Sequence, residues 1–571
     1  MTQKSNAPFP WFDPLAVGRQ WGEIAAKSQK VLAGSATGLE QARTVVPDSA
    51  VQAWGRFWQD VALNPARLAM PNLGDASARA NPRDRRFKHE AWEQQPGFKA
   101  LRDSYLIGSD WLRHLVEGAE NLSPADRKRV NFYAEQLIDA MAPTNFWATN
   151  PEVLAKVSET GGINLLEGFS NFLDDVAAGA GHVRRADPEA FRFGVDIAAT
   201  KGSVVLRTDL MELIQFEPTT PKVDQVPLLI VPPWVNKYYL FDLKKKSSFI
   251  QWAVDQGLTV FTISWVNPDE RHAEKDFEDY YAEGFKAAVD AILETTGESR
   301  VNVFSYCLGG TLTATSLACM AAEKDDRVAS ATLVAAMTDF TDFGDFEVFV
   351  DPDQIESLRS ATREKGHVTS GDLSLLFSLL RANDLIWSSV VSRYLLAEDR
   401  LASDMLYWFS DGIGMPAKML DTFMRRIMLE NVLASPGALS FHGTPIDLAK
   451  VRTPLCFVSM KDDHVAGWEA TYRGAARFRT EKRFILGGSG HNAGTINPPA
   501  AGRHGYWLND DFPAEPEAWL TAAEKHEGSW WTEWRNWLGR HGGEQVQARP
   551  VEDGKLPVLE AAPGSYARQG H

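Results

Sequence analysis

Hydrophobic positions recur at two different spacings along the chain. Over residues 81–195 they repeat every three or four residues, as in Leu101, Tyr105 and Leu112, which is the spacing of one face of a helix. From residue 196 on, the pattern changes to short apolar runs that are bounded by turn residues and separated by helix-length segments. The first pattern predicts a helical N-terminal domain, and the second predicts a mostly parallel sheet covered by helices.

Six of the apolar runs are predicted to be strands of that sheet. Between the fourth and the fifth run, residues of about 340–450 are rich in Leu and Trp and show no strand pattern. We interpret this stretch as a cap inserted into an α/β catalytic domain that spans residues 196–571. The six runs are residues 226–231, 258–265, 301–305, 330–336, 455–460 and 484–486.

Residues 1–80 are mixed in character and are predicted to be a variable leader. They hold a helical pattern over 21–33, and residues 65–82 are rich in Pro, Gly and Ala. The first residues lack the charged start and apolar run of a secretory signal, so no export is expected. No stretch reaches the roughly 18 consecutive apolar residues of a membrane-spanning helix, so any membrane contact is expected to be superficial.

Composition narrows the classes of function. Of 571 residues 44% are hydrophobic and 23% are charged, which is typical of globular proteins. A formal net charge of -16 argues against a nucleic-acid partner, because phosphate binding needs a basic surface. Cys307, Cys319 and Cys456 are too few and too scattered for a disulfide framework or a zinc site. We therefore expect a reducing compartment and no bound metal.

Cys307 lies between an apolar run and a helical run that starts near Thr311. This strand, sharp turn and helix is the pattern of a nucleophile elbow, in which small neighbours such as Gly309 and Gly310 let strand and helix approach. A thiolate that attacks a thioester exchanges one thioester for another, so acyl transfer is nearly isoenergetic. The glycine usual two residues before the nucleophile is replaced by Ser305. A lone cysteine is also commonly a small buried apolar residue, and this reading stays open for Cys307 and is favoured for Cys319 and Cys456.

An acid and a histidine follow in the order expected of α/β-hydrolases, each after a late strand. Asp462, Asp463 and His464 follow the fifth run, and His491 lies in a glycine-rich loop after the sixth. His491 is the candidate general base, and one of the two aspartates would orient it. Residues 488–493 also fit a degenerate dinucleotide fingerprint, but no βαβ unit follows them.

Several longer segments between about Asp84 and the C-terminus match a known family. They are 105–107 (YLI), 142–146 (APTNF), 210–218 (LMELIQFEP), 232–238 (PPWVNKY), 263–269 (ISWVNPD), 381–387 (RANDLIW), 490–499 (GHNAGTINPP) and 528–531 (GSWW). Together they resemble the class I polyhydroxyalkanoate synthases. The resemblance implies an α/β-hydrolase fold with an inserted cap and a helical N-terminal domain, and a catalytic set of Cys307, Asp463 and His491.

The resemblance further implies an acyltransferase that polymerises short (R)-3-hydroxyacyl groups, such as 3-hydroxybutyryl, from coenzyme A thioesters. Coenzyme A would be part of the substrate and a product, so no cofactor is expected. The implied partners are the growing polyester chain and its granule surface, a second copy of the chain in a homodimer, and phasins. The implied location is the cytoplasm, on polyhydroxyalkanoate granules.

Residues beyond the catalytic set are assigned as candidates only. In α/β-hydrolases the oxyanion is held by the backbone amide after the nucleophile, here Leu308, and by the loop after an early strand, here Val235. Arg381 could hold the coenzyme A phosphates or form an ordinary salt bridge. Trp408 lies where the family has Asn next and Thr shortly after, but this chain has Phe409 and Ile413. The candidates for substrate binding are Trp234, Asn236, Arg381, Trp408 and His464.

Two other functions fit the same sequence. A thioesterase or polyester depolymerase would use the same elbow but let water attack the acyl intermediate, so it would form free 3-hydroxy acid. A granule scaffold that keeps the fold without chemistry would release no thiol, and its Cys307 would react with iodoacetamide like an ordinary thiol.

Overall fold

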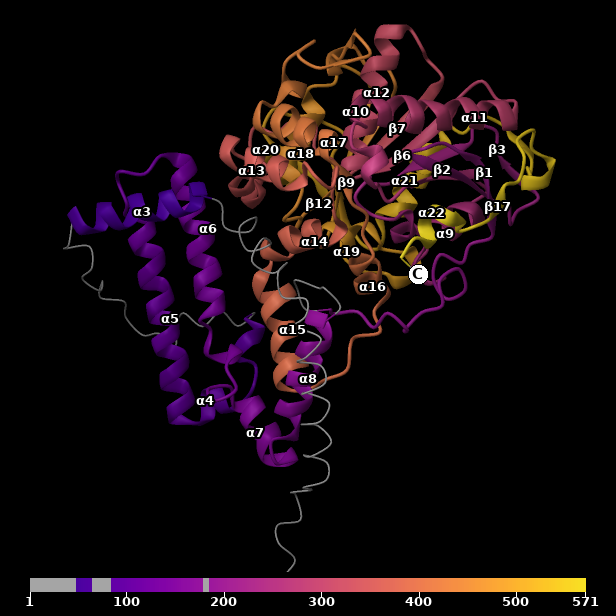
Figure 1. Ribbon diagram of the computed structural model, residues 1–571. Helices are drawn as coiled ribbons and strands as arrows, with labels where there is room; N and C mark the ends of the chain where they lie inside the picture. The colour runs from indigo at the N-terminus through magenta and orange to yellow at the C-terminus, as the bar shows by residue number, and fades with distance from the viewer. Residues whose placement is uncertain (1–47, 64–83, 178–183, 571) are drawn as a thin grey trace, which may run out of the picture. The chain divides into compact units, whose positions relative to one another are not determined.

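The computed structural model describes residues 48–63, 84–177 and 184–570, which form two compact units (Figure 1). The helical unit holds the described residues up to Asp187 together with Gly371–Leu401, and the sheet unit holds Pro188–Ser370 and the residues from Ala402 on. The helical pattern predicted over 21–33 and the passage 65–82 lie outside the described residues.

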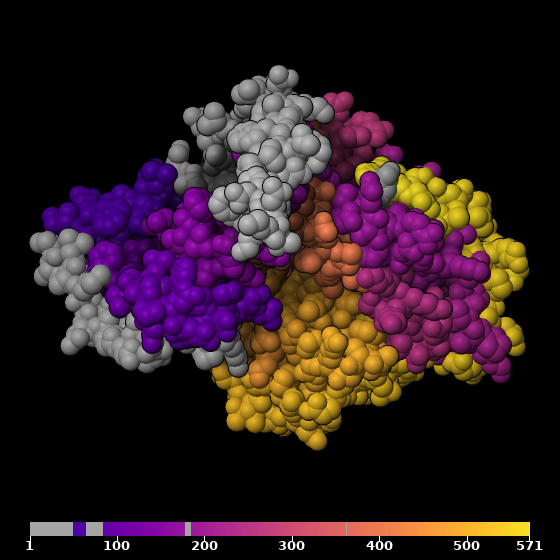
Figure 2. Space-filling view, turned by 90° about the horizontal axis from the view of Figure 1, so that it is seen from below, coloured from indigo at the N-terminus to yellow at the C-terminus, as the bar shows by residue number. Residues whose placement is uncertain are grey.

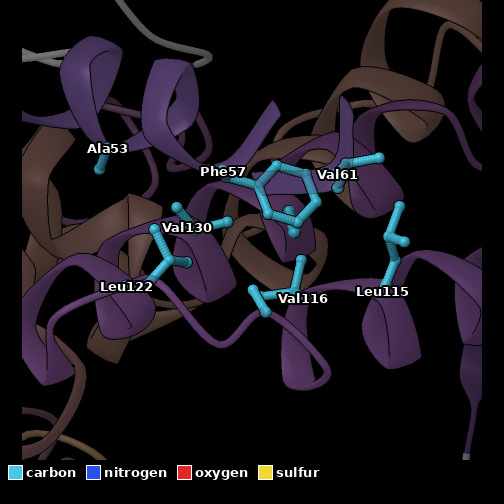
Figure 3. Packing of buried hydrophobic residues seen from close by; sticks show 9 residues of the cluster. Ala53, Phe57, Val61, Leu115, Val116, Leu122 and Val130 are labelled. Carbon is cyan, nitrogen blue, oxygen red and sulfur yellow. The ribbon is translucent and has the colours of Figure 1, made fainter. Parts of the chain in front are cut away.

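The core of the helical unit includes a helix from the predicted leader. Residues Asp48–Leu63 form α3, whose Phe57 is fully buried and packs with Val116 of α5 and Val130 of α6 (Figure 3). Residues 48–63 of the predicted leader therefore contribute to the N-terminal core. In the described residues before 187, the other α-helices are α4 (Ala91–Gln94), α5 (Pro96–Glu117), α6 (Pro124–Ala140), α7 (Pro151–Thr160) and α8 (Ile163–Ala177).

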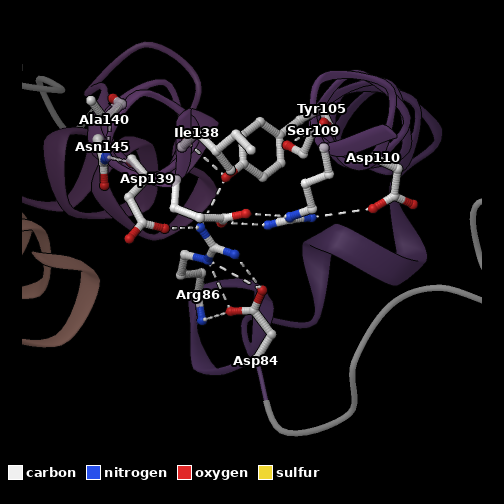
Figure 4. Close-up of polar contacts among 11 residues, drawn as sticks. Asp84, Arg86, Tyr105, Ser109, Asp110, Ile138, Asp139, Ala140 and Asn145 are labelled. Carbon is white, nitrogen blue, oxygen red and sulfur yellow. Dashed lines mark hydrogen bonds and ion pairs between the residues drawn. The ribbon is translucent and has the colours of Figure 1, made fainter. Parts of the chain in front are cut away.

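One arginine ties the start of this unit to two of its helices. Arg86 forms an ion pair with Asp84 at 2.9 Å and another with Asp139 of α6 at 3.0 Å (Figure 4). Its guanidinium also donates to the Tyr105 hydroxyl of α5 at 2.9 Å. Arg86 is half-buried, and these charge-assisted contacts join the start of the unit to both α5 and α6.

Residues 371–401, from the middle of the predicted cap, pack on α8 in the helical unit. A Cβ atom on Gly168 of α8 would collide with the carbonyl oxygen of Tyr394, so the two backbones touch directly. Asp175 of α8, 1% exposed, accepts a hydrogen bond from the Tyr394 hydroxyl at 2.9 Å and pairs with Arg400 at 2.8 Å. The stretch predicted as one cap is thus divided, because only residues 340–370 and 402–450 belong with the sheet. The helices here are α14 (Ser370–Leu379) and α15 (Ser388–Val390), with π-helical turns at Asn383–Trp387 and Val391–Leu395.

The sheet unit is built on a mixed sheet, which has eleven strands in the described part of the chain. Its centre is a parallel block in the order β13-β12-β7-β6-β4-β5, and these are the six strands predicted from the apolar runs. The prediction of an α/β-hydrolase fold with a helical N-terminal domain is confirmed. The block consists of β4 (Leu228–Val231), β5 (Val260–Trp265), β6 (Val301–Tyr306), β7 (Val328–Val334), β12 (Leu455–Met460) and β13 (Lys482–Gly487).

The strands that sequence patterning missed are antiparallel and lie at the two edges of this block. Here β2 is buried along its whole length, but Glu212 and Gln215 interrupt its apolar run. The Glu212 carboxylate, fully buried, pairs with Arg207 of β1 at 2.6 Å, which compensates its burial. These strands are β1 (Gly202–Arg207), β2 (Met211–Phe216), β14 (Tyr506–Leu508), β15 (Glu524–His526) and β17 (Glu560–Ala561).

Helices of the sheet unit connect these strands and carry the site loops. In the described residues no helix combines the length and the apolar character that crossing a membrane requires. Short strands elsewhere in the unit are β3 (Lys222–Asp224), β8 (His367–Val368), β9 (Met415–Pro416), β10 (Ser440–Phe441), β11 (Thr444–Pro445) and β16 (Gln545–Gln547). The helices are α9 (Phe249–Asp255), α10 (Phe277–Asp279), α11 (Ala287–Thr296), α12 (Leu308–Glu323), α13 (Pro352–Thr362), α16 (Asp404–Ser410), α17 (Ala417–Thr422), α18 (Trp468–Ala476), α19 (His491–Thr495), α20 (Pro516–Ala522), α21 (Trp530–Gly539) and α22 (Gly564–Arg568).

Candidate active site

Cys307 lies at the single residue between β6 and α12, where the chain turns sharply. Its backbone angles, φ 51° and ψ -124°, are in a region that L-residues rarely adopt. Strain of this kind costs on the order of 1–3 kcal/mol and persists where the surroundings enforce it, typically at active sites. Here the amide of Cys307 donates to Val334 of β7 and its carbonyl accepts from Gly310 of α12, each at 2.9 Å. Strand and helix together hold the thiol at the turn.

The two glycines after Cys307 let helix and sheet meet. A Cβ atom on Gly309 would collide with the carbonyl oxygen of Val231, and one on Gly310 would collide with the side chain of Ala336. Both positions therefore require glycine, as the elbow pattern indicates. Ser305 fits in place of the usual earlier glycine because its hydroxyl, fully buried, donates to the carbonyl of Thr332 at 2.8 Å.

His491 begins α19, directly after the loop that follows β13. Its Nδ1 lies 2.6 Å from Oδ2 of Asp463, whose side chain is fully buried. The other carboxylate oxygen, Oδ1, accepts the backbone amides of Val465 and Ala466 at 2.8 and 2.9 Å. With both oxygens engaged, the carboxylate is fixed in a position to orient the imidazole. Asp462, the other aspartate considered, is exposed.

The imidazole of His491 interacts with Asp463 and with Cys307. Burial alone would lower the pKa of His491, but the charges of Asp463 and Cys307, with hydrogen bonds to both, raise it to about 10. Since Nδ1 is taken by Asp463, Nε2 is the nitrogen left for the thiol. Cys307, Asp463 and His491, which follow β6, β12 and β13, thus lie in a Cys–His–Asp chain at the carboxyl ends of parallel strands, where open α/β sheets place their sites.

Residues 232–237, which we call the β4 loop, lie beside the first turn of α12. The close approach of Gly309 to Val231 brings the start of this loop next to Leu308, the first residue of α12. The indole of Trp265 in β5 donates to the carbonyl of Pro232 at 2.8 Å and holds the loop at its beginning. The backbones of Leu308 and Val235, the two candidate oxyanion donors, therefore belong to neighbouring segments.

Sequence reasoning did not identify the residues that support His491. The ring of Tyr306 lies 5.0 Å from the His491 ring, and its hydroxyl donates to Oδ1 of Asn492 at 2.6 Å. The buried indoles of Trp530 and Trp531 donate to the carbonyls of Gly494 and Thr495 in α19, at 2.8 and 2.9 Å. Only the positions of Tyr306 and Asn492, next to Cys307 and His491, signalled such a role in the sequence.

Two of the candidates for substrate binding, Trp234 and Trp408, are buried in the sheet unit. Trp234 is fully buried against Phe277 and Phe423, so it packs beneath the β4 loop and has no exposed face. Trp408, 3% exposed, donates from its indole to the carbonyl of Lys237 at 2.8 Å and is likewise a packing residue.

The remaining polar candidates lie at the surface or beside the loop. Asn236 is partly buried and forms a β-bridge with Gly412, and His464 is exposed next to Asp463. Arg381 belongs to the helical unit, where its exposed guanidinium pairs with Asp384.

The other two thiols are buried. Cys319 in α12 and Cys456 in β12 are fully buried, and burial raises the pKa of each, that of Cys319 to about 11. Cys307 is the partly exposed member of the three. In the part of the chain that the structure describes, no His, Cys, Asp and Glu side chains are grouped to hold a metal ion.

Comparison with known proteins agrees with this architecture. Residues 83–253 match the family model "Poly-beta-hydroxybutyrate polymerase (PhaC) N-terminus", and residues 227–498 match that of the alpha/beta hydrolase fold. The chain is 41% identical over 528 residues to a poly(3-hydroxyalkanoate) polymerase of Methylorubrum extorquens, with 91% of this chain and 87% of that protein covered. It is 37% identical over 502 residues to the poly(3-hydroxyalkanoate) polymerase subunit PhaC of Cupriavidus necator, with 87% and 85% covered. This chain belongs to the poly(3-hydroxyalkanoate) polymerase family.

Proposed function

We propose that this chain polymerises short (R)-3-hydroxyacyl groups, such as 3-hydroxybutyryl, from coenzyme A thioesters through an acyl group bound to Cys307. The observation that carries the proposal is the strained cysteine at the elbow, in contact with an imidazole that is itself held by a buried carboxylate. The family supports polyester synthesis as the outcome of this chemistry.

In the first half of the cycle, His491 takes the proton from the Cys307 sulfur. The thiolate attacks the thioester carbonyl, and the backbone amides of Leu308 and Val235 stabilise the oxyanion that forms. The bond between the carbonyl carbon and the coenzyme A sulfur then breaks. The His491 proton goes to the departing thiolate, so that coenzyme A leaves as a thiol and the acyl group stays on Cys307.

In the second half, the 3-hydroxyl of a further acyl group attacks the carbonyl of the Cys307 thioester. His491 takes the hydroxyl proton and returns it to the Cys307 sulfur as that thioester breaks, and the new ester lengthens the chain. Asp463 is assigned to orienting His491, because both of its oxygens already accept hydrogen bonds. The cycle uses no cofactor, since coenzyme A arrives as part of the substrate.

The further expectations from the resemblance belong to the same proposal. They are a homodimer, attachment to the surface of cytoplasmic polyester granules, and contact with phasins. Arg381 is retained as a proposed contact for coenzyme A phosphates, with Asn236 and His464 as proposed polar contacts of the substrate.

Product analysis after incubation with 3-hydroxybutyryl-coenzyme A tests the proposed function. We expect thiol release to be matched by hydroxybutyryl units in an insoluble polyester, because a hydroxyl and not water attacks the acyl group. The measurement is thiol release by colorimetry together with polymer and free acid by chromatography.

Two results would point elsewhere. An amount of free 3-hydroxybutyrate equal to the thiol released would make the chain a thioesterase or depolymerase. No thiol release at all would support a scaffold without chemistry. A parallel incubation with a long-chain 3-hydroxyacyl-coenzyme A is expected to be slower, and equal or faster turnover would contradict the short-chain assignment.

A further inference from the structure

The β4 loop is fastened by a segment that lies far along the chain. Trp408 donates to the carbonyl of Lys237 at 2.8 Å, and the amide of Ile413 donates to the carbonyl of Val235 at 3.1 Å. Between these two contacts, Gly412 forms a β-bridge with Asn236. Residues 408–413 therefore bind the backbone of the loop at three successive positions, one of which is the candidate oxyanion donor Val235.

Lys237 lies at the end of this loop with its side chain 2% exposed. Its ammonium group pairs with Asp411 at 2.6 Å and donates to the carbonyl of Gln569 at 2.6 Å. The second oxygen of Asp411 accepts the Tyr239 hydroxyl at 2.7 Å. Burial lowers the pKa of Lys237, and the neighbouring Asp411 charge opposes this shift. A lysine is rarely buried to this degree unless it is paired.

The C-terminal segment supplies the third partner of this arrangement. It is anchored by β17, which pairs with β1, and by the amide of Tyr566, which donates to Glu212 at 3.1 Å. In Figure 2 the yellow C-terminal residues lie beside the magenta residues that follow the N-terminal helices. The side chain of Gln569 accepts the amide of Asn267, just after β5, at 3.1 Å. Gln569 thus lies beside the loops that follow β4 and β5.

We propose that Lys237 and Asp411 are positioning residues of the acyl-transfer site, which clamp the β4 loop so that the Val235 amide faces the developing oxyanion. This inference rests on the proposed function. A buried ion pair contributes little net stability compared with apolar side chains of similar size, so geometric control is a better account of its presence. The clamp also explains how the amide of Val235, on a loop, keeps its position relative to the helical amide of Leu308.

The test compares Lys237→Met, Asp411→Asn and the double variant with the wild type in coenzyme A release from 3-hydroxybutyryl-coenzyme A. We expect kcat to fall roughly 10- to 100-fold in each single variant with KM changed by less than about 3-fold, because the lost contact acts on the transition state. The double variant is expected to be no slower than Lys237→Met, because both changes remove the same pair.

Alkylation of Cys307 by iodoacetamide separates positioning from general damage. This reaction forms no oxyanion, so its rate in the variants is expected to stay within about 2-fold of the wild type. Lys286→Met serves as the matched control, because Lys286 forms a partly exposed pair with Asp290 away from the β4 loop. Thermal unfolding checks that each variant is folded. If Lys237→Met does not fold, the comparison of Asp411→Asn with the wild type tests the clamp.

Two outcomes would overturn the clamp. One is a folded variant whose kcat stays within about 2-fold of the wild type, and the other is an alkylation rate that falls together with kcat, which would mean that the thiol itself is disturbed. If wild type and Lys286→Met released no coenzyme A while Cys307 remained reactive, the proposed function would fail and the clamp with it.

Discussion

Replacing Cys307 by alanine is expected to lower coenzyme A release from 3-hydroxybutyryl-coenzyme A by roughly 10⁴-fold or more, to the floor of the assay. The substitution removes the sulfur that accepts the acyl group, and nothing else at the elbow can replace it. Alanine keeps the Cβ atom, so the strained backbone at φ 51° is not altered. Thermal unfolding of the variant should therefore match that of the wild type.

Cys456→Ala provides the matched control for this loss. Cys456 is a fully buried thiol in β12, so its replacement costs stability without touching the reaction. We expect kcat of the Cys456 variant to remain at the wild-type value while its unfolding temperature drops. Coenzyme A release that persisted in Cys307→Ala would contradict the assignment of Cys307 as the nucleophile.

Replacing His491 by glutamine is expected to lower kcat by roughly 10³-fold or more, because proton transfer to and from the sulfur loses its carrier. Glutamine is close to histidine in size and can still donate a hydrogen bond to Asp463, so the buried carboxylate keeps a partner. Steady-state kinetics on the folded variant measure the effect. A loss of less than about tenfold would mean that another group acts as the base.

The same variant is expected to change how alkylation of Cys307 depends on pH. The charges of Asp463 and Cys307 overcome the effect of burial and raise the pKa of His491 to about 10, so the imidazole keeps its proton as the pH rises through neutrality. A protonated imidazole stabilises the thiolate, and glutamine cannot. The rate of alkylation by iodoacetamide increases with pH, and we expect this increase to begin at a higher pH in His491→Gln than in the wild type. Identical dependence of the alkylation rate on pH in the two proteins would contradict the pairing of His491 with Cys307.

The parallel centre of the sheet could be predicted because each of its strands is an apolar run between turn residues. The edge strands could not, since β2 carries Glu212 inside a buried run and this carboxylate is compensated by Arg207 of another strand. The division of the predicted cap between the two units could not be predicted either. It depends on the direct contact of Gly168 with Tyr394, two residues that no local pattern links.

The candidate catalytic set could be proposed from the sequence because order along the chain and position after a strand are local features. The choice between Asp462 and Asp463 rested on the family resemblance, and the structure brings Asp463 to His491. The roles of Trp234 and Trp408 could not be predicted, because an indole that faces a substrate and one that packs under a loop look alike in a sequence. The Lys237–Asp411 pair joins two segments that come together only in the folded chain.

The most direct test of the central claim is peptide mapping by mass spectrometry after brief mixing with 3-hydroxybutyryl-coenzyme A and an acid quench. We predict hydroxybutyryl units bound as a thioester to the peptide that contains Cys307, and none on the corresponding peptide of Cys307→Ala. An acyl group found on a different residue, while Cys307 stays unmodified and coenzyme A is released, would contradict the account.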